Sequence, residues 1–388
     1  MREGRRAEGP KGRRARRFLT AIVASAVILT AVHVAGAQPA AKAAIPARFT
    51  DAEFWKFIVD NSEPEGSFTS ENLLSNETGY QMVIPALLKA PRTNRIYLGV
   101  GPEQNFTYIN ALKPKMAVIF DIRRGNLLGH LLYKALFELS TDRADFVSRL
   151  FGKPRPKGLD STSSASAIMA AYWDVWGDST LYEKNYRDIT EQLLRKHGFA
   201  LSAQDTSRMW WIYNQFYSNG LTLTYTSNNG RNGPSGMPNY REITTATDGL
   251  GHNLGFLGSE ANFRYIKDLE TKNLIIPVVG NFGGRTAIKS VGAWLKEHDG
   301  VVAAFYASNV EQYLFQDGIA WNYYDNVSTL PIDSNSVIIR SVGGGRGMNF
   351  YGGSGMRGPN LMCPIRRLLE ANAAGRIGQY GDIFNYCE

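Results

Sequence analysis

The chain has 388 residues, of which 44% are hydrophobic and 20% charged, and this composition excludes a disordered or fibrous protein. Its formal net charge of +8 is concentrated at the N-terminus, because residues 1–37 carry eight Lys and Arg side chains against two acids. The rest of the chain is close to neutral. We therefore expect no nucleic-acid partner, since binding along phosphates needs a concentrated basic face.

The N-terminal segment has the pattern of an export signal. An apolar run at residues 18–35 follows the basic arm and leads into Ala35-Gly36-Ala37, a small-x-small sequence typical of signal cleavage. The pattern predicts export to the periplasm or the extracellular space after cleavage near Ala37. The run also approaches the roughly 20 residues that span a bilayer, so a single-pass N-terminal anchor is the open alternative. No other segment is expected to contact a membrane.

An Ala- and Pro-rich linker at residues 38–48 precedes the folded body, which we expect to begin near residue 49. Thr50 and Glu53 offer a cap for a first helix. Strands are then predicted where short apolar runs occur, at 95–100, 116–120, 274–279, 301–306 and 336–341. Helices are predicted where apolar residues recur at helical spacing, at 106–112, 127–139, 142–151, 166–218, 259–271 and 286–298.

This alternation predicts a doubly wound α/β domain over residues 49–342, with a mainly parallel, Rossmann-like sheet. An α-helical insertion is expected at about 152–240, where aromatic residues are dense and favour core packing over a cofactor cage. Residues 343–388 are expected to form a Gly-rich segment and a C-terminal tail with a short helix from Pro364.

The chain contains only two cysteines, Cys363 and Cys387, both near the C-terminus. Export would place them where thiols oxidise, which favours a disulfide that pins the tail. Two separate buried thiols are the open alternative.

The candidate ligand-binding residues lie at one edge of the predicted sheet. Gly99 and Gly101 surround the end of the first strand, and Asp121 ends the second strand 22 residues after Gly99. In a Rossmann-like sheet this spacing places a glycine turn beside an acid that can accept hydrogen bonds from ribose hydroxyls. The turn lacks GxGxxG, and Glu103 would oppose phosphate charge, so S-adenosylmethionine fits better than a dinucleotide. An ordinary tight turn is the alternative.

Four strings resemble an uncharacterised, often exported bacterial family whose fold is similar to class I S-adenosylmethionine-dependent methyltransferases. They are residues 70–77, 97–109, 121–124 and 305–314. The resemblance runs from about residue 50 to 342 and implies no established reaction. Asn281 stands where that family more often has Asp.

The resemblance implies one pocket with a cofactor side and a substrate side. The implied cofactor-binding residues are Gly99, Gly101, Glu103, Asn105, Asp121 and Asp248. The implied substrate side holds Asn281, Ser308, Asn309 and Glu311, with Glu311 and Asn309 as the catalytic candidates and Glu311 as the base.

Each of these roles has a structural alternative. Asp248-Gly249 is a common turn dipeptide, and Ser308-Asn309 can cap a helix. Asp121 can pair with an arginine or cap a helix, in which case its replacement would lower stability and spare ligand binding.

The arginine and histidine side chains also have structural alternatives to a functional role. Arg123 and Arg124 can bind an anionic substrate, although pairing with Glu71 or Glu77 is favoured. His130 and His252 have no second ligand at metal-binding spacing, so no metal site is expected.

The sequence therefore predicts an exported or anchored methyltransferase-like protein that binds a nucleoside-type small molecule, with S-adenosylmethionine as the candidate cofactor. Because that donor is made in the cytosol, an exported domain would find it scarce. The alternative is a non-catalytic binding or envelope-associated protein that retains the fold. The substrate and the oligomeric state are not indicated by the sequence.

Overall fold

The structure is a computed structural model, and it describes residues 43–68, 70–225, 237–341 and 360–387. The predicted signal or anchor at residues 1–37 and most of the Gly-rich segment lie outside these ranges. Within the described ranges, no helix combines the length and apolar character needed to cross a bilayer. Export, cleavage near Ala37 and anchoring stay predictions.

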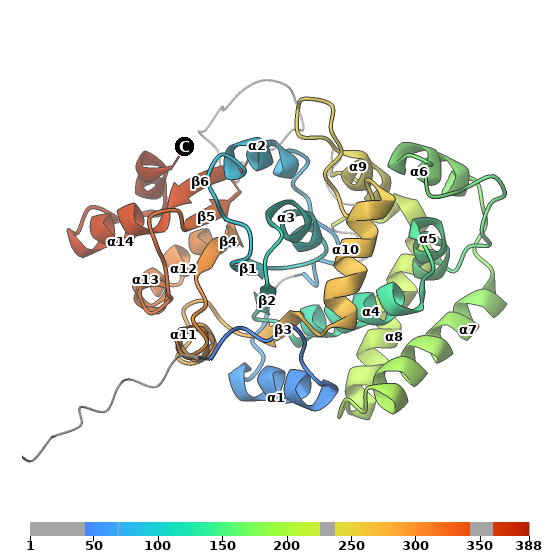
Figure 1. Ribbon diagram of the computed structural model, residues 1–388, viewed down its shortest axis with the longest axis horizontal. Coiled ribbons are helices and arrows are strands. Elements are labelled where there is room, and N and C mark those ends of the chain that lie inside the picture. Colours follow the sequence, from blue (N-terminus) through green and yellow to red (C-terminus); the bar gives the residue numbers. More distant parts are fainter. Residues whose placement is uncertain (1–42, 69, 226–236, 342–359, 388) are drawn as a thin grey trace, which may run out of the picture. The chain divides into compact units, whose positions relative to one another are not determined.

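In the part of the chain that the structure describes, six strands form one sheet in the order β3-β2-β1-β4-β5-β6 (Figure 1). They are β1 Ile96–Val100, β2 Met116–Asp121, β3 Ile275–Val279, β4 Val302–Ser308, β5 Val337–Arg340 and β6 Leu361–Pro364. Neighbouring strands from β3 to β5 are parallel, and β6 pairs antiparallel with β5. The predicted α/β class and mainly parallel sheet are confirmed, and the topology is compatible with a Rossmann-like fold.

Strands β1, β2 and β3 are fully buried, as expected of a parallel sheet covered on both faces. The strand order reverses between β1 and β4, because the chain runs outward from β1 to β3 and then returns to the other side of β1. Crevices at the carboxyl ends of strands beside such a reversal are the usual ligand sites of open α/β sheets.

The helices pack in two groups on the two sides of the strands (Figure 1). α10 contacts both α3 and α4, whereas α11 contacts both α1 and α13. The α-helices are α1 Asp51–Asn61, α2 Ile84–Leu87, α3 Gln104–Leu112, α4 Arg124–Leu139, α5 Arg143–Phe151, α6 Ala165–Trp173, α7 Ser179–Thr190, α8 Ala203–Asn219, α9 Tyr240–Thr245, α10 Glu260–Thr271, α11 Ala287–Glu297, α12 Val310–Gln316, α13 Ala320–Ser328 and α14 Ile365–Ala373. Among the described residues, the 3₁₀-helices are η1 Tyr80–Val83, η3 Gly220–Thr222 and η5 Tyr380–Tyr386, and η2 Glu191–Lys196 is a π-helix.

The helical insertion between β2 and β3 is present, and α4 to α10 all lie between these strands, where helices were predicted. Its aromatic residues pack against one another, as the stack of Tyr182 on Tyr213 and Tyr217 shows, with ring centroids 5.0 and 4.3 Å apart. Trp173, Trp176 and Trp210 are exceptions, with 39, 90 and 46% of their surfaces exposed. The aromatic density therefore serves mainly the core, as predicted.

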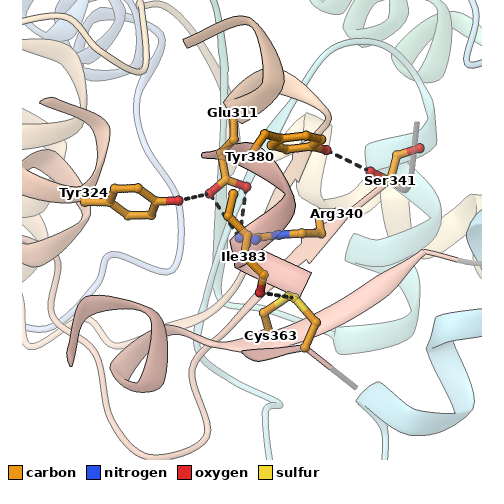
Figure 2. Close-up of a disulfide and its surroundings, with 8 residues drawn as sticks. Glu311, Tyr324, Arg340, Ser341, Cys363, Tyr380 and Ile383 are labelled. Carbon is orange, nitrogen blue, oxygen red and sulfur yellow. Dashed lines mark hydrogen bonds and ion pairs between the residues drawn. A yellow bond between two sulfur atoms is a disulfide. The ribbon is translucent and has the colours of Figure 1, made fainter. Parts of the chain in front are cut away.

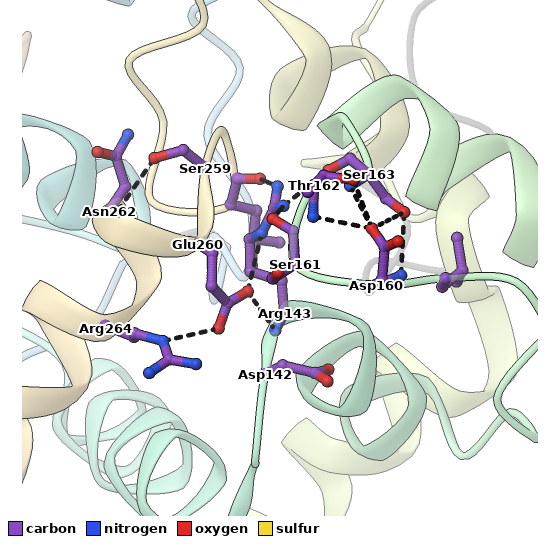
Figure 3. Close-up of polar contacts among 12 residues, drawn as sticks. Asp142, Arg143, Asp160, Ser161, Thr162, Ser163, Ser259, Glu260, Asn262 and Arg264 are labelled. Atoms are coloured by element: carbon purple, nitrogen blue, oxygen red, sulfur yellow. Dashed lines mark hydrogen bonds and ion pairs between the residues drawn. The ribbon is translucent and has the colours of Figure 1, made fainter.

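Arg143 anchors the Pro- and Ser-rich break of the insertion (Figure 3). Its guanidinium donates to the carbonyl oxygens of Ser163 and Leu257 at 2.7 and 3.0 Å and pairs with Glu260 of α10 at 3.2 Å. Because the side chain is buried, these partners replace the water it would otherwise bind. One arginine thus ties the loop before α6 to the helix that precedes β3.

The C-terminal region belongs to the sheet instead of forming a separate tail. β6 adds to β5, and a disulfide joins Cys363 of β6 to Cys387 after η5 (Figure 2). The predicted disulfide is confirmed. The boundary drawn at residue 342 is corrected, because β6 and α14 pack on the domain that the boundary was meant to end.

Candidate functional site

A cavity of about 820 Å³ opens at the carboxyl ends of β1, β2, β3 and β4. Its wall is completed by the loop that precedes η1 and by the first turns of α12. The volume lies in the range of small-molecule sites, and the place is the strand-order reversal at β1 and β4.

The turn after β1 is built to leave space for a ligand. Gly101 lines the cavity with φ at +78°, and a Cβ added there would meet nothing within 4 Å. Asn105 holds the turn, since its Nδ2 donates to the carbonyl oxygens of Val100 and Pro102 at 2.9 and 2.8 Å. Gly99 is required because a Cβ would lie 1.9 Å from Oδ1 of Asn105. Of the predicted turn residues, Gly101 faces the cavity, whereas Gly99 and Asn105 shape the turn.

Asp121 lines the cavity at the end of β2, but its carboxylate is already engaged. Arg123 binds it with Nε to Oδ1 at 2.8 Å and Nη2 to Oδ2 at 2.5 Å, and its backbone N–H donates to Oδ1 at 2.9 Å. Three of about four acceptor positions are therefore filled. Among the described residues, Oδ2 has one hydrogen-bond partner and keeps one acceptor position.

Both arginines form structural ion pairs, as the sequence favoured, and Asp121 is one of the partners. Arg123 pairs with Asp121, and Arg124 pairs with Asp205 at 2.5 Å. Among the described residues, Glu77 forms no ion pair and accepts hydrogen bonds from neutral groups, so pairing of either arginine with Glu77 is not observed.

Glu103 does not line the cavity, which corrects the cofactor-binding role implied for it. It points into a small interior space beside Tyr80 and Thr107, where it accepts a hydrogen bond from the backbone of Ser75 at 3.3 Å. Burial raises the pKa of Glu103 to about 7.

Asp248 also lies outside the cavity wall. Its carboxylate accepts hydrogen bonds from the backbone of Leu250 at 2.8 Å and from Nδ1 of His252 at 3.0 Å. It therefore stabilises its own turn, as the structural alternative predicted.

Glu311 is not placed to act as a base in the cavity (Figure 2). Its side chain is buried, pairs with Arg340 at 2.9 Å and accepts a hydrogen bond from the hydroxyl of Tyr324 at 3.0 Å. Burial raises the pKa of Glu311, and the charge of Arg340 opposes that rise. Its predicted neighbours Asn309 and Asn281 do lie on the cavity wall.

His130 supports the glycine turn. Its Nε2 lies 2.9 Å from the carbonyl oxygen of Gly101, and burial lowers the pKa of the imidazole to about 4. The described residues contain no group of three or more His, Cys, Asp or Glu side chains arranged to hold a metal ion.

Glu77 is the site residue that sequence reasoning missed. It is 3% exposed and lines the cavity. Oε1 accepts hydrogen bonds from the hydroxyls of Tyr306 and Ser308 at 2.8 and 2.7 Å, and Oε2 accepts from the amides of Gln104 and Asn360 at 2.9 and 2.8 Å. The sequence did contain a signal, because Glu77 belongs to the string 70–77, but we interpreted Glu77 as a salt-bridge partner of Arg123 or Arg124.

Ser308 combines a place on the cavity wall with an unusual backbone. Its φ is +49°, a left-handed value that is uncommon outside glycine, and the pairing of β4 with β5 is irregular between Tyr306 and Ser308. Such backbone conformations cluster at ligand sites, where surrounding contacts hold them. Here the hydrogen bond to Glu77 is one such contact.

A family model described as a domain of unknown function (DUF7790) matches residues 73–219 and 224–354. The chain belongs to this family. The matched ranges include β1 to β5 and Glu77, so most of the cavity wall lies in the family domain.

Two curated relatives match over shorter stretches. An RNA replication protein of Potato virus X is 29% identical over 118 residues, which are 29% of this chain and 7% of the viral protein. The RNA replication protein of strain HB is 27% identical over 137 residues, 34% of this chain and 8% of the viral protein. The chain thus spans less than a tenth of the length of these relatives.

Proposed function

We propose that the cavity binds a nucleoside-type small molecule, with S-adenosylmethionine as the leading candidate, and that the chain is an exported or membrane-anchored methyltransferase-like protein. The observation that carries this proposal is the position of the cavity. It lies at the strand-order reversal, with the open Gly101 turn on one side and Asp121 on the other. The free acceptor direction of Asp121 suits one ribose hydroxyl.

The charge of the cavity favours a ligand without phosphate. Of the described residues on its wall, three are acidic and one is basic, namely Glu77, Asp121, Asp317 and Arg123. Because Arg123 is committed to Asp121, its charge is compensated inside the protein. A phosphate would therefore meet negative potential, whereas a neutral or positively charged nucleoside would be favoured.

The wall supplies polar groups that position a substrate more readily than groups that carry protons. Its described residues include no His, Lys or Cys, and Glu311 lies elsewhere. Asn281 and Asn309 present carboxamides that can donate to an acceptor molecule. Methyl transfer in this setting would depend on alignment, with a base needed only for a protonated acceptor.

The second candidate function is a non-catalytic binding protein of the cell envelope. The Asp121–Arg123 pair favours it, because a carboxylate held by a buried ion pair contributes to a rigid binding wall. Export, if it occurs, also separates the chain from cytosolic S-adenosylmethionine.

Thermal unfolding of the purified full-length chain tests the proposal. A ligand at 100 times its dissociation constant stabilises by about 2.7 kcal/mol. We expect S-adenosylmethionine to raise the melting temperature and ATP to leave it unchanged. No shift with S-adenosylmethionine or S-adenosylhomocysteine at millimolar concentration would overturn the nucleoside proposal. A shift without any conversion to S-adenosylhomocysteine in the presence of envelope extract would favour the binding protein.

A further inference from the structure

Glu77 is a buried carboxylate whose acceptor positions are filled by neutral donors. An ionised carboxylate has about four acceptor positions, and Glu77 receives four hydrogen bonds, two on each oxygen. The donors come from β4, from α3 and from the residue before β6, so distant parts of the chain converge on this one side chain. Such convergence fixes the carboxylate rigidly at the cavity wall.

No described cation compensates this charge. Among the described residues, Glu77 forms no ion pair, and the arginine on the same wall is bound to Asp121. A buried charge interacts more strongly with a ligand than an exposed charge does, because the dielectric around it is lower. The described wall therefore carries negative charge that a bound positive charge would neutralise.

The hydrogen-bond pattern restricts the kind of cation. A primary ammonium would need an acceptor position on Glu77, and all of them are taken. A sulfonium or quaternary ammonium ion has no N–H group and needs only the field of the carboxylate. Tyr306 and Tyr313 line the same wall and suit such an ion, since aromatic rings attract positive charge. The ring of Phe68, by contrast, already lies under the guanidinium of Arg123.

We propose that Glu77 makes the cavity selective for an onium ion without N–H groups, a sulfonium or a quaternary ammonium, which it recognises through its field. This inference rests on the proposed function, because it specifies the charge of the ligand that occupies the same cavity. The inference assigns this selectivity for charge to Glu77, in the loop before η1, and not to the glycine turn at Gly101.

Calorimetric titration with S-adenosylmethionine and S-adenosylhomocysteine tests the inference, because the two ligands differ by the sulfonium methyl group and its charge. At pH 8 we expect the full-length chain to prefer S-adenosylmethionine by about tenfold. Glu77→Gln should reduce this preference to about twofold or less, since it removes the charge and keeps the size. Equal affinities in the unmodified chain, or an unchanged preference in Glu77→Gln, would overturn the inference.

Glu103→Gln is the matched control. Glu103 is also a buried acid near Ser75, with a pKa of about 7, so it is mostly ionised at pH 8, but it faces away from the cavity. The variant should keep the preference for S-adenosylmethionine. If it abolishes the preference as Glu77→Gln does, general loss of negative charge is responsible and the inference is overturned.

A second pair of probes separates this inference from the proposed function. Choline and 3,3-dimethyl-1-butanol have the same shape and differ in charge. We expect choline to raise the melting temperature of the unmodified chain, the neutral alcohol to leave it unchanged, and Glu77→Gln to lose the choline effect. Adenosine binding without any preference for charged ligands would overturn the inference and leave the proposed function standing. Choline selectivity without nucleoside binding would overturn the nucleoside proposal and leave the charge selectivity of the cavity standing. If neither pair of probes shows a difference, the nucleoside proposal and the inference about Glu77 are both overturned.

Discussion

The carboxylate of Asp121 and the guanidinium of Arg123, two residues apart at the end of β2, form a bidentate ion pair on the cavity wall. Each side chain is only 5% exposed, so each charge depends on the other for compensation. Asp121 therefore has two roles in our account: it holds Arg123, and it keeps one acceptor direction for a ligand.

Replacement of Asp121 should reduce stability as well as binding. Asp121→Ala leaves a buried guanidinium without its partner, which typically costs about 3–5 kcal/mol. Urea unfolding measures this change. In the double variant Asp121→Ala with Arg123→Met, the loss should be smaller than the sum of the two single losses. Additive losses would show that the pair contributes no coupling.

The fold could be predicted from the sequence further than the site could. β1 and β2 are apolar runs buried on both faces, which is why their positions could be read directly. β6 was missed because it has only four residues and ends in Pro364. A short antiparallel edge strand gives little periodic signal.

The site was predictable only where strand ends determine it. Asp121 lies at the cavity because the ends of parallel strands share one edge. Glu103 and Glu311 were misplaced because each lies at the start of a helix, where the rotation of the helix decides which side chain faces the cavity. Glu77 lies in an irregular loop, and only tertiary contacts bring it to the wall.

The disulfide should stabilise the C-terminal segment locally. Its 24-residue separation corresponds to about 3 kcal/mol by the loop-entropy relation. Reduction should increase hydrogen exchange in η5 while the amides of β1 and β2 stay protected, as followed by mass spectrometry. Native protein in which both Cys363 and Cys387 react with an alkylating reagent before reduction would contradict the bridge.

His197 should make stability depend on pH. It lies between Glu138 and Asp51, with nitrogen–oxygen distances of 2.7 and 2.9 Å. Partial burial disfavours the charged imidazole, but the hydrogen bond and charge of Glu138 raise the pKa of His197 overall. Its stabilisation is therefore complete below about pH 6.5, the unfolded value, and is lost as pH rises through the raised folded pKa.

His197→Gln isolates this contribution. The difference in free energy of unfolding between the unmodified chain and the variant should be larger at pH 6 than at pH 9. Glu138 stays ionised throughout, because the paired His197 and Lys134 outweigh burial and hold its pKa at about 2. A difference that does not change with pH would contradict the charged bridge.

Ser308 should carry backbone strain that glycine relieves. Ser308→Ala and Ser308→Gly both remove the hydroxyl that donates to Glu77, but only glycine adopts a φ of +49° without a steric penalty. Ser308→Gly should therefore be more stable than Ser308→Ala by about 1 kcal/mol in urea unfolding. Equal stability would show that this conformation is unstrained.

The most direct test of the account is calorimetric titration of S-adenosylmethionine into the unmodified chain and into a variant whose cavity is partly filled by a new side chain. Gly101→Asn places a side chain in the open space of the turn, and Asn tolerates the left-handed backbone that Gly101 adopts. Gly158→Asn is the control, because Gly158 has a similar φ of +80° and open surroundings but lies outside the cavity wall. We predict one binding site in the unmodified chain and in Gly158→Asn, and an affinity at least about tenfold lower in Gly101→Asn. Absence of binding in the unmodified chain, or equal affinity in all three, would contradict the account.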